Sequence, residues 1–247
     1  MTNEATLDKL QRMKLTGMLA AFRQTMETHF AQNFSADELL AHLVDAEWDE
    51  RHNRKLARLL KNANFRYKAS FEKIDFSQSR ELDKNLLLRL SACDWLRKAE
   101  NVLIIPMNRD VGKSFIVSAL GHQACLSGFK VLYSSSLKLF SKLKFAKADG
   151  TYDKELKHIQ KQQLLILDDF GLHPIDEQSK LILLELLEDR YGESSTIIAS
   201  QFHSKAWYDI IDSPTIADAI LDRLVHNAYQ IQLSGDSMRK NSKTDSG

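Results

Sequence analysis

Five short apolar segments, separated by segments of helix length, constrain the fold of this 247-residue chain most strongly. They are residues 101–105 (NVLII), 130–135 (KVLYSS), 164–168 (LLILD), 195–200 (STIIAS) and 229–233 (YQIQL). Strands that are apolar along most of their length are typical of parallel sheets, which are buried on both faces. Parallel neighbours need long crossover connections, which are usually helices. The sequence therefore predicts an α/β fold in which helices sandwich a parallel sheet.

The N-terminal third of the chain has helical periodicity instead. Apolar residues predict an amphipathic helix from residue 6 to about 28. A second helix begins after Ser35, where Glu38 completes a capping box, and runs to about residue 62. We expect a helical domain over residues 1–70, a polar linker over 71–85, the sheet domain over 86–236 and a polar tail over 237–247.

Composition and charge exclude several classes of protein. Hydrophobic residues make up 43% and charged residues 27% of the chain, and the longest apolar runs are too short for a membrane span. The start, MTNEATLDKL, lacks the basic front and apolar centre of a signal peptide. Two cysteines, Cys93 and Cys125, make no disulfide framework. We expect a cytoplasmic protein with no membrane partner.

Residues 111–114 (VGKS) follow a predicted strand and open a predicted helix, which is the context of a phosphate-binding loop. In such a loop the first amides of the helix surround the phosphates, Lys113 reaches the β- and γ-phosphate oxygens, and Ser114 binds Mg²⁺. The pattern G-x-x-x-x-G-K-[ST] would place glycine at 107, where this chain has Met107. The predicted cofactor-binding residues are Asp110, Val111, Gly112, Lys113, Ser114 and Phe115.

A second motif strengthens the nucleotide interpretation. The segment LLILDDFG is an apolar strand that ends in paired acids, and it follows Lys113 after one intervening strand. In a Walker B element Asp168 would hold Mg²⁺ through water, and Asp169 would polarise the attacking water. A strand followed by an Asp-rich turn is the simpler alternative. The order and spacing of the two motifs favour a site for ATP and Mg²⁺.

Two more polar residues lie where such a fold could use them. Gln201 follows the strand 195–200 and can position the water or sense the γ-phosphate, although a strand-end turn is the simpler interpretation. Arg223 lies on a predicted helix before the last strand and can reach the phosphate of a neighbouring subunit as an arginine finger. Its alternative is an intrachain salt bridge to Asp218 or Asp222. Arg190 is a weaker candidate finger.

The net charge of +1 conceals a basic run over residues 51–68, which contains seven Lys or Arg and no Asp or Glu. Such a run can lie along the phosphate backbone of double-stranded DNA. A basic helix face that is merely solvated is the alternative. The candidate DNA-binding residues are Arg51, Arg54, Lys55, Arg58 and Lys61.

From Leu7 to Lys240 the chain resembles the IstB-type helper ATPases encoded beside the transposases of bacterial insertion sequences, which are relatives of the helicase-loader branch of AAA+ proteins. The segments that carry the resemblance are MKLTGM (13–18), FEKIDF (71–76), NVLII (101–105), VGKSFIVSALGHQAC (111–125), KLKFAKADGTYDKELK (142–157), LLILDDFGL (164–172), STIIASQ (195–201), ADAILDRLVHNA (217–228) and SGDSMRK (234–240).

The resemblance implies an ATP-dependent DNA-binding protein that forms a homo-oligomer on DNA, with nucleotide between subunits, and regulates a cognate transposase. It implies a P-loop AAA+ domain without a C-terminal lid, preceded by helices for assembly and DNA contact. Lys113 and Ser114 match the Walker A pair, and Asp168 and Asp169 the Walker B pair. Gln201 matches the first sensor and Arg223 the finger.

The chain departs from this family in the first half of the phosphate loop. Family members usually have GPTGVGKS, whereas here Pro106 to Asp110 replaces the glycine-rich part and adds one residue. We expect reduced Mg-ATP affinity and impaired ATP hydrolysis to ADP and phosphate. Two alternatives stay open at this point, a nucleotide-independent DNA-binding or adaptor protein on a dead ATPase fold, and a replicative helicase loader.

Overall fold

The computed structural model describes residues 3–28, 34–74, 76, 82–106, 112–203 and 206–233. The chain forms two compact units, unit 1 (residues 1–58) and unit 2 (residues 59–247). The two meet inside one continuous helix, α3 (Ala36–Ala63), whereas the sequence predicted a linker at 71–85. Ile74, from that segment, is buried within unit 2.

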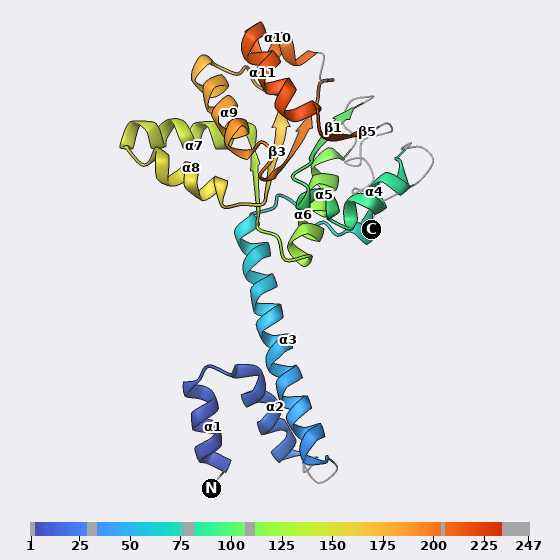
Figure 1. The fold of residues 1–247 in the computed structure, drawn as a ribbon, viewed down its shortest axis with the longest axis vertical. Coiled ribbons are helices and arrows are strands. Elements are labelled where there is room, and N and C mark those ends of the chain that lie inside the picture. Colours follow the sequence, from blue (N-terminus) through green and yellow to red (C-terminus); the bar gives the residue numbers. More distant parts are fainter. Residues whose placement is uncertain are drawn as a thin grey trace, which may run out of the picture. The chain divides into compact units, whose positions relative to one another are not determined.

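Unit 2 is built on one five-stranded sheet with the strand order β2-β3-β4-β1-β5 (Figure 1). Every paired strand is parallel, as predicted. All five predicted strands are present, and β3 extends beyond its predicted end. They are β1 (Asn101–Pro106), β2 (Val131–Ser135), β3 (Leu164–Phe170), β4 (Ser195–Ser200) and β5 (Ala228–Leu233).

Helices follow or connect these strands. Gly128, with φ of 88°, follows the helix after β1, and Gly150, with φ of 77°, ends the helix after β2, so both turns use the left-handed region that glycine tolerates. The helices of unit 2 after α3 are α4 (Lys84–Ser91), α5 (Asp94–Arg97), α6 (Lys113–Leu126), α7 (Ser136–Asp149), α8 (Tyr152–Gln160), α9 (Glu177–Arg190), α10 (Trp207–Ile211) and α11 (Pro214–Val225), with a short 3-10 helix at Phe71–Lys73.

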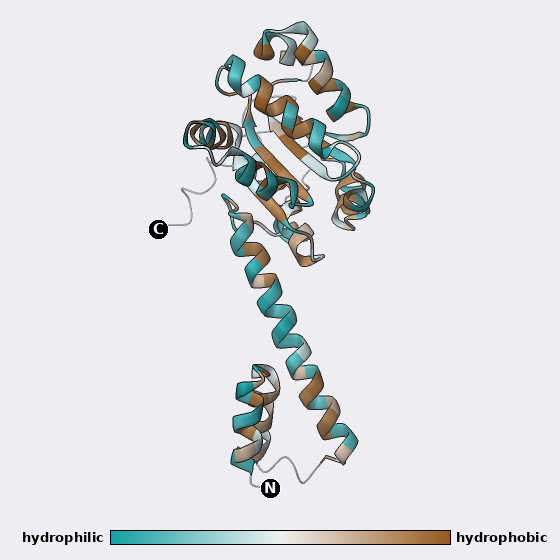
Figure 2. Cartoon of the chain, turned by 60° about the vertical axis from the view of Figure 1, so that its left-hand side comes forward, coloured by the Kyte–Doolittle hydropathy of each residue, from teal (hydrophilic) through white to brown (hydrophobic). Residues whose placement is uncertain are grey.

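The core of unit 2 lies on the sheet. Leu103 of β1, Leu165 and Leu167 of β3, and Ile198 of β4 are completely buried in one cluster with side chains of α7, α9 and α11. The hydropathy colouring in Figure 2 shows strands of the sheet as continuous apolar elements. Burial of this kind contributes roughly 25 cal/mol per Å² of apolar surface. It fixes the strand ends, from which the polar residues of the site project.

Unit 1 contains α1 (Asn3–Arg12), α2 (Thr16–Glu27) and the first part of α3. The prediction of one helix from residue 6 to about 28 is wrong, because α1 ends at Arg12 and α2 begins at Thr16. Between them Lys14 adopts a left-handed φ of 59°. The predicted capping box is present. Ser35 N donates to Glu38 Oε2 at 2.8 Å, and Glu38 N donates to Ser35 Oγ at 3.3 Å.

Within the described part of the chain, no helix has both the length and the apolar character needed to cross a membrane. The predicted polar tail at 237–247 lies outside the described residues.

Candidate functional site

The strand order brings three predicted site segments to one edge of the sheet. Strand β4 lies between β1 and β3, and all three run in the same direction. Their carboxyl ends therefore meet at the same edge, where open α/β sheets bind ligands. Lys113 follows β1, Asp168 lies near the end of β3, and Gln201 follows β4.

The second half of the predicted phosphate loop has the geometry that a phosphate site needs. Gly112 adopts a left-handed φ of 75° immediately before α6, and Lys113 is the first residue of that helix. The helix is 14 residues long, so its first amides present a partial positive charge. Ser114, the next residue, is half-buried, and its carbonyl accepts a hydrogen bond of 2.6 Å from Ser118 Oγ.

The first half of that loop lies outside the described residues. Met107, Asp110 and Val111 therefore stay predictions. Phe115 is described as the third residue of α6, where its amide donates to the Gly112 carbonyl at 3.0 Å.

Asp168 is a buried carboxylate that is held by two hydrogen bonds. Its Oδ2 accepts from the Tyr133 hydroxyl at 2.5 Å, and its Oδ1 accepts from the Asp169 amide at 2.9 Å. Burial raises the pKa of Tyr133, and the hydrogen bond to Asp168 raises it further, so the phenol remains a proton donor. A carboxylate oriented in this way can serve as a hard oxygen ligand for Mg²⁺.

Asp169 differs from its neighbour in conformation and in partner. It adopts a left-handed φ of 55° where the pairing of β3 with β4 shifts register between Leu167 and Phe170. Such a conformation costs a residue with a Cβ on the order of 1 kcal/mol. The carboxylate is turned toward Arg66, whose Nη1 donates to Asp169 Oδ2 at 3.0 Å.

A cavity of about 390 Å³ opens beside this ion pair. Its lining combines two cationic side chains, Arg66 and Lys138, with hydroxyl and amide groups. The lining residues are Asn64, Phe65, Arg66, Tyr133, Ser134, Ser135, Lys138 and Asp169.

The end of β4 is tied to the end of β3. Ser200 Oγ donates to the Phe170 carbonyl at 3.0 Å, and Trp207 Nε1 donates to Ser200 Oγ at 3.2 Å. These bonds fix the backbone from which Gln201 projects, half-buried, at the edge that carries Asp168. A polar side chain placed there can contact a water molecule or a phosphate.

Arg223 does not lie at the carboxyl edge of the sheet with the other predicted site residues. Its carbonyl accepts from Asn101 Nδ2 at 3.1 Å, and Asn101 is the first residue of β1. The six residues of β1 separate this end from the carboxyl edge by roughly 20 Å. Arg223 forms an ion pair with Glu188 and donates from Nη1 to the Ala219 carbonyl at 2.8 Å. Arg223 therefore forms an intrachain salt bridge, as in the alternative to the finger, but its partner is Glu188 in place of Asp222 or Asp218.

Arg190 is used inside the domain. It is 2% exposed, and its guanidinium donates to the carbonyls of Gln162 at 3.0 Å and Ser195 at 2.5 Å. Burial lowers its pKa to about 10, which still leaves it charged at neutral pH. In this conformation Arg190 cannot reach a neighbouring subunit, so it is not a finger candidate.

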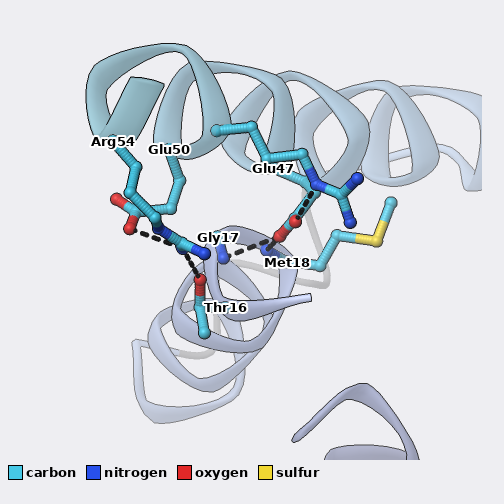
Figure 3. A network of polar contacts seen from close by, with 7 residues as sticks. Thr16, Gly17, Met18, Glu47, Glu50 and Arg54 are labelled. Atoms are coloured by element: carbon cyan, nitrogen blue, oxygen red, sulfur yellow. Dashed lines mark hydrogen bonds and ion pairs between the residues drawn. The ribbon is translucent and has the colours of Figure 1, made fainter. Parts of the chain in front are cut away.

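Two of the five candidate DNA-binding residues already have acidic partners. Arg51 Nε pairs with Glu47 at 2.6 Å, and Arg54 Nη2 pairs with Glu50 at 2.9 Å. Figure 3 shows Arg54 reaching Thr16 of α2 as well, through a hydrogen bond of 2.5 Å. The other three candidates, Lys55, Arg58 and Lys61, are exposed.

Tyr133 and Arg66 were not predicted as site residues. A signal for Tyr133 was available, because a tyrosine near the end of the neighbouring strand can reach the acid on β3. No signal existed for Arg66, which is 103 residues from its partner in sequence.

The family model described as IstB-like ATP binding protein matches residues 8–246. "Putative insertion sequence ATP-binding protein y4pL" of Sinorhizobium fredii is 46% identical and covers 98% of each chain. "Insertion sequence IS1162 putative ATP-binding protein" of Pseudomonas fluorescens is 37% identical, with the alignment covering 83% of this chain and 88% of that protein.

Solved structures support the fold at low sequence identity. The DnaC helicase loader superposes with a TM-score of 0.54 at 15% identity, over 61% of this chain and 87% of the loader. AMPPCP-bound DnaA from Aquifex aeolicus gives a TM-score of 0.58 at 18% identity, over 70% of this chain and 52% of DnaA. The parallel sheet of unit 2 therefore has an AAA+-like fold.

Proposed function

The chain belongs to the family of IstB-like ATP binding proteins, and from this premise we propose that it hydrolyses Mg-ATP while assembled on double-stranded DNA as the helper of an insertion-sequence transposase. One observation carries the enzymatic part of this proposal. Lys113, the Asp168–Asp169 pair and Gln201 come from three separate segments of the sequence, and the sheet brings the three segments to one edge.

The proposed roles follow from position and chemistry. The ammonium of Lys113 and the first amides of α6 bind the phosphates. Ser114 and Asp168 supply oxygen ligands for Mg²⁺, which neutralises phosphate charge when bound. Asp169 orients and polarises the attacking water, and Gln201 contacts that water or the γ-phosphate.

Arg223 is proposed to act on the nucleotide of a neighbouring subunit. Its distance from the carboxyl edge of its own sheet prevents it from serving the site of its own chain. Its pair with Glu188 can open, since the Glu188 side chain is 60% exposed. This role requires a homo-oligomer in which one chain completes the site of the next.

DNA contact is proposed for the exposed residues Lys55, Arg58 and Lys61, with Arg51 and Arg54 contributing when they exchange their acidic partners for phosphates. Phosphate contacts of this type position a protein on DNA without reading its sequence. We assign the partner as a transposase because the relatives from Sinorhizobium fredii and Pseudomonas fluorescens bear insertion-sequence names.

The altered first half of the phosphate loop is proposed to weaken Mg-ATP binding. A variant that restores glycine at 107 and 110 and deletes the extra residue should bind Mg-ATP more tightly, because amides could then approach the phosphates closely. Calorimetry compares the two proteins. Equal affinities would contradict this view of the loop.

A phosphate-release assay with and without double-stranded DNA tests the enzymatic proposal. We expect Lys113→Ala to reduce the rate at least 100-fold, because it removes a charge that stabilises the transition state. Lys98→Ala removes an exposed lysine away from the site and serves as the control. Equal rates in the wild type and Lys113→Ala would favour a nucleotide-independent DNA-binding or adaptor protein. A pull-down that compares binding of this chain to a transposase and to a replicative helicase distinguishes a transposition helper from a helicase loader.

A further inference from the structure

The ion pair between Arg66 and Asp169 joins the segment after α3 to the proposed catalytic edge. Arg66 Nη1 lies 3.0 Å from Asp169 Oδ2, and the two side chains are 43% and 28% exposed. Both residues belong to unit 2. The pair involves the one carboxylate to which we assign the polarisation of water, so it bears directly on hydrolysis.

A guanidinium bonded to a carboxylate makes that carboxylate a poorer proton acceptor, because it stabilises the charged form. It also occupies one Asp169 oxygen with a hydrogen bond. At the same time the pair is weak, since partly exposed ion pairs are screened by solvent. The contact therefore suppresses Asp169 while it lasts, and a competing anion can break it.

The segment that carries Arg66 is anchored by its neighbour. The Phe65 ring packs against the Tyr133 ring with 6.2 Å between centroids. Phe65 also packs so closely on α6 that a Cβ at Gly121 would lie 2.5 Å from its Cε1 atom. The backbone at residue 66 can therefore stay in place while the long arginine side chain changes partner.

The cavity beside the pair suits a phosphate group. Arg66 and Lys138 contribute positive charge, and Asn64 and Ser135 contribute an amide and a hydroxyl donor. The Ser134 hydroxyl donates to the Ser135 carbonyl at 3.0 Å, and Asp169 is the one carboxylate among the lining residues. A guanidinium binds phosphate with two parallel hydrogen bonds, which is a stronger contact than its single bond to Asp169. Two more exposed lysines, Lys61 and Lys68, flank Arg66 in the sequence and extend the same charge.

We propose that Arg66 is a DNA-responsive latch on Asp169, which opens when a backbone phosphate of double-stranded DNA enters this cavity and takes the guanidinium. This inference rests on the proposed function for its effect on hydrolysis. In the free protein Asp169 is bound to Arg66 and hydrolysis is slow. On DNA the carboxylate is released and can polarise the attacking water.

Two measurements on the full chain test the latch. Phosphate release is measured with and without double-stranded DNA for the wild type and Arg66→Gln. We expect Arg66→Gln to raise the DNA-free rate up to about fivefold, the factor that corresponds to a partly exposed ion pair. The stimulation by DNA should fall by a similar factor. Arg97→Gln, which removes an exposed arginine from its pair with Asp94, should leave both rates unchanged.

The second measurement needs no hydrolysis. Fluorescence anisotropy gives the affinity for a DNA duplex in the wild type, Arg66→Gln, Asp169→Asn and the double variant. Because the coupling is reciprocal, Asp169→Asn should tighten DNA binding up to about fivefold when Arg66 is present. In the Arg66→Gln background the same change should have a smaller effect.

The outcomes separate the latch from the enzymatic proposal. If the two substitutions act additively on DNA affinity, or if the duplex does not bind, the latch is overturned whatever the rates are. It is also overturned if the chain hydrolyses ATP and Arg66→Gln leaves the DNA-free rate unchanged. A wild type with no more activity than Lys113→Ala overturns the enzymatic proposal, and the affinity cycle then decides the latch alone.

Discussion

The two units of the chain are stabilised in different ways. In unit 2 the strands β3 and β4 are almost entirely buried, and each has consecutive Leu or Ile side chains at its centre. In unit 1 the buried residues among those described are Gly17, Ala21, Thr25 and Glu47. Unit 2 therefore depends on apolar burial, whereas unit 1 depends on a close helix contact and a buried carboxylate.

The contact in unit 1 is centred on the start of α2. Glu47 Oε2 accepts from the amides of Gly17 at 2.8 Å and Met18 at 3.2 Å, which are among the unpaired donors at a helix N-terminus (Figure 3). Arg51, a candidate DNA-binding residue, pairs with the same carboxylate. The comparison indicates that apolar burial holds the proposed chemistry in place, whereas salt, and DNA under the proposed function, can influence unit 1.

The largest expected effect is the loss of a side chain from the core of unit 2. Leu165→Ala removes a completely buried side chain of β3 and should lower the free energy of unfolding by about 2–5 kcal/mol. Urea denaturation measures this change, and hydrogen exchange of the unit 2 amides locates it. Leu181→Ala, at a side chain that is 54% exposed, is the control and should cost below about 0.5 kcal/mol.

A smaller effect is expected where α2 approaches α3. A Cβ at Gly17 would lie 2.3 Å from the Ala46 carbonyl oxygen, so Gly17→Ala must push the two helices apart. We expect a loss of about 1–3 kcal/mol of local stability, seen as faster exchange of the α2 amides. Exchange in β3 and β4 of the same sample is the internal reference. Unchanged exchange in α2 would show that the close approach is not needed.

The smallest effect is expected at Glu47 and should depend on pH. Burial alone would raise the pKa of Glu47, but hydrogen bonds from Arg51, Met18 and Gly17 outweigh it, so the pKa lies below its ordinary value. The contribution to stability is therefore present above the ordinary pKa and is lost as the pH falls through the lowered one. Glu47→Gln should cost on the order of 1 kcal/mol at neutral pH and remove that part of the pH dependence.

The control for this prediction is Glu50→Gln. Glu50 also faces an arginine, Arg54, but both side chains are about half exposed. Its replacement should change stability by less than about 0.5 kcal/mol. If Glu50→Gln and Glu47→Gln had the same effect across the acid range, the buried carboxylate would have no special role in unit 1.

The sequence was sufficient to predict the five strands because buried parallel strands are apolar along most of their length. It also assigned Lys113, Asp168 and Gln201 to one nucleotide site, and the shared direction of β1, β3 and β4 brings the segments that carry them to one edge. It did not predict the break between α1 and α2. Leu10, Met13 and Leu15 continue a helical pattern, whereas the break depends on Lys14 and on a carboxylate on another helix.

The partners of the site residues were the least predictable feature. Glu188 binds Arg223 from another helix, although Asp222 and Asp218 were closer in sequence. Arg66 contacts Asp169, which lies 103 residues further along the sequence. Such contacts depend on the packed fold, because a charged side chain alone does not specify which of several acids it will meet.

Arg223 lies near the amino-terminal end of β1, and this position affects how many complete sites an assembly can contain. Under the proposed role, a complete site belongs to the junction between two chains, so a lone chain has none. An open row has one junction fewer than it has chains, whereas a closed ring has as many junctions as chains. Turnover per chain would then rise with protein concentration at fixed nucleotide, and it would level off once few chains are left at free ends.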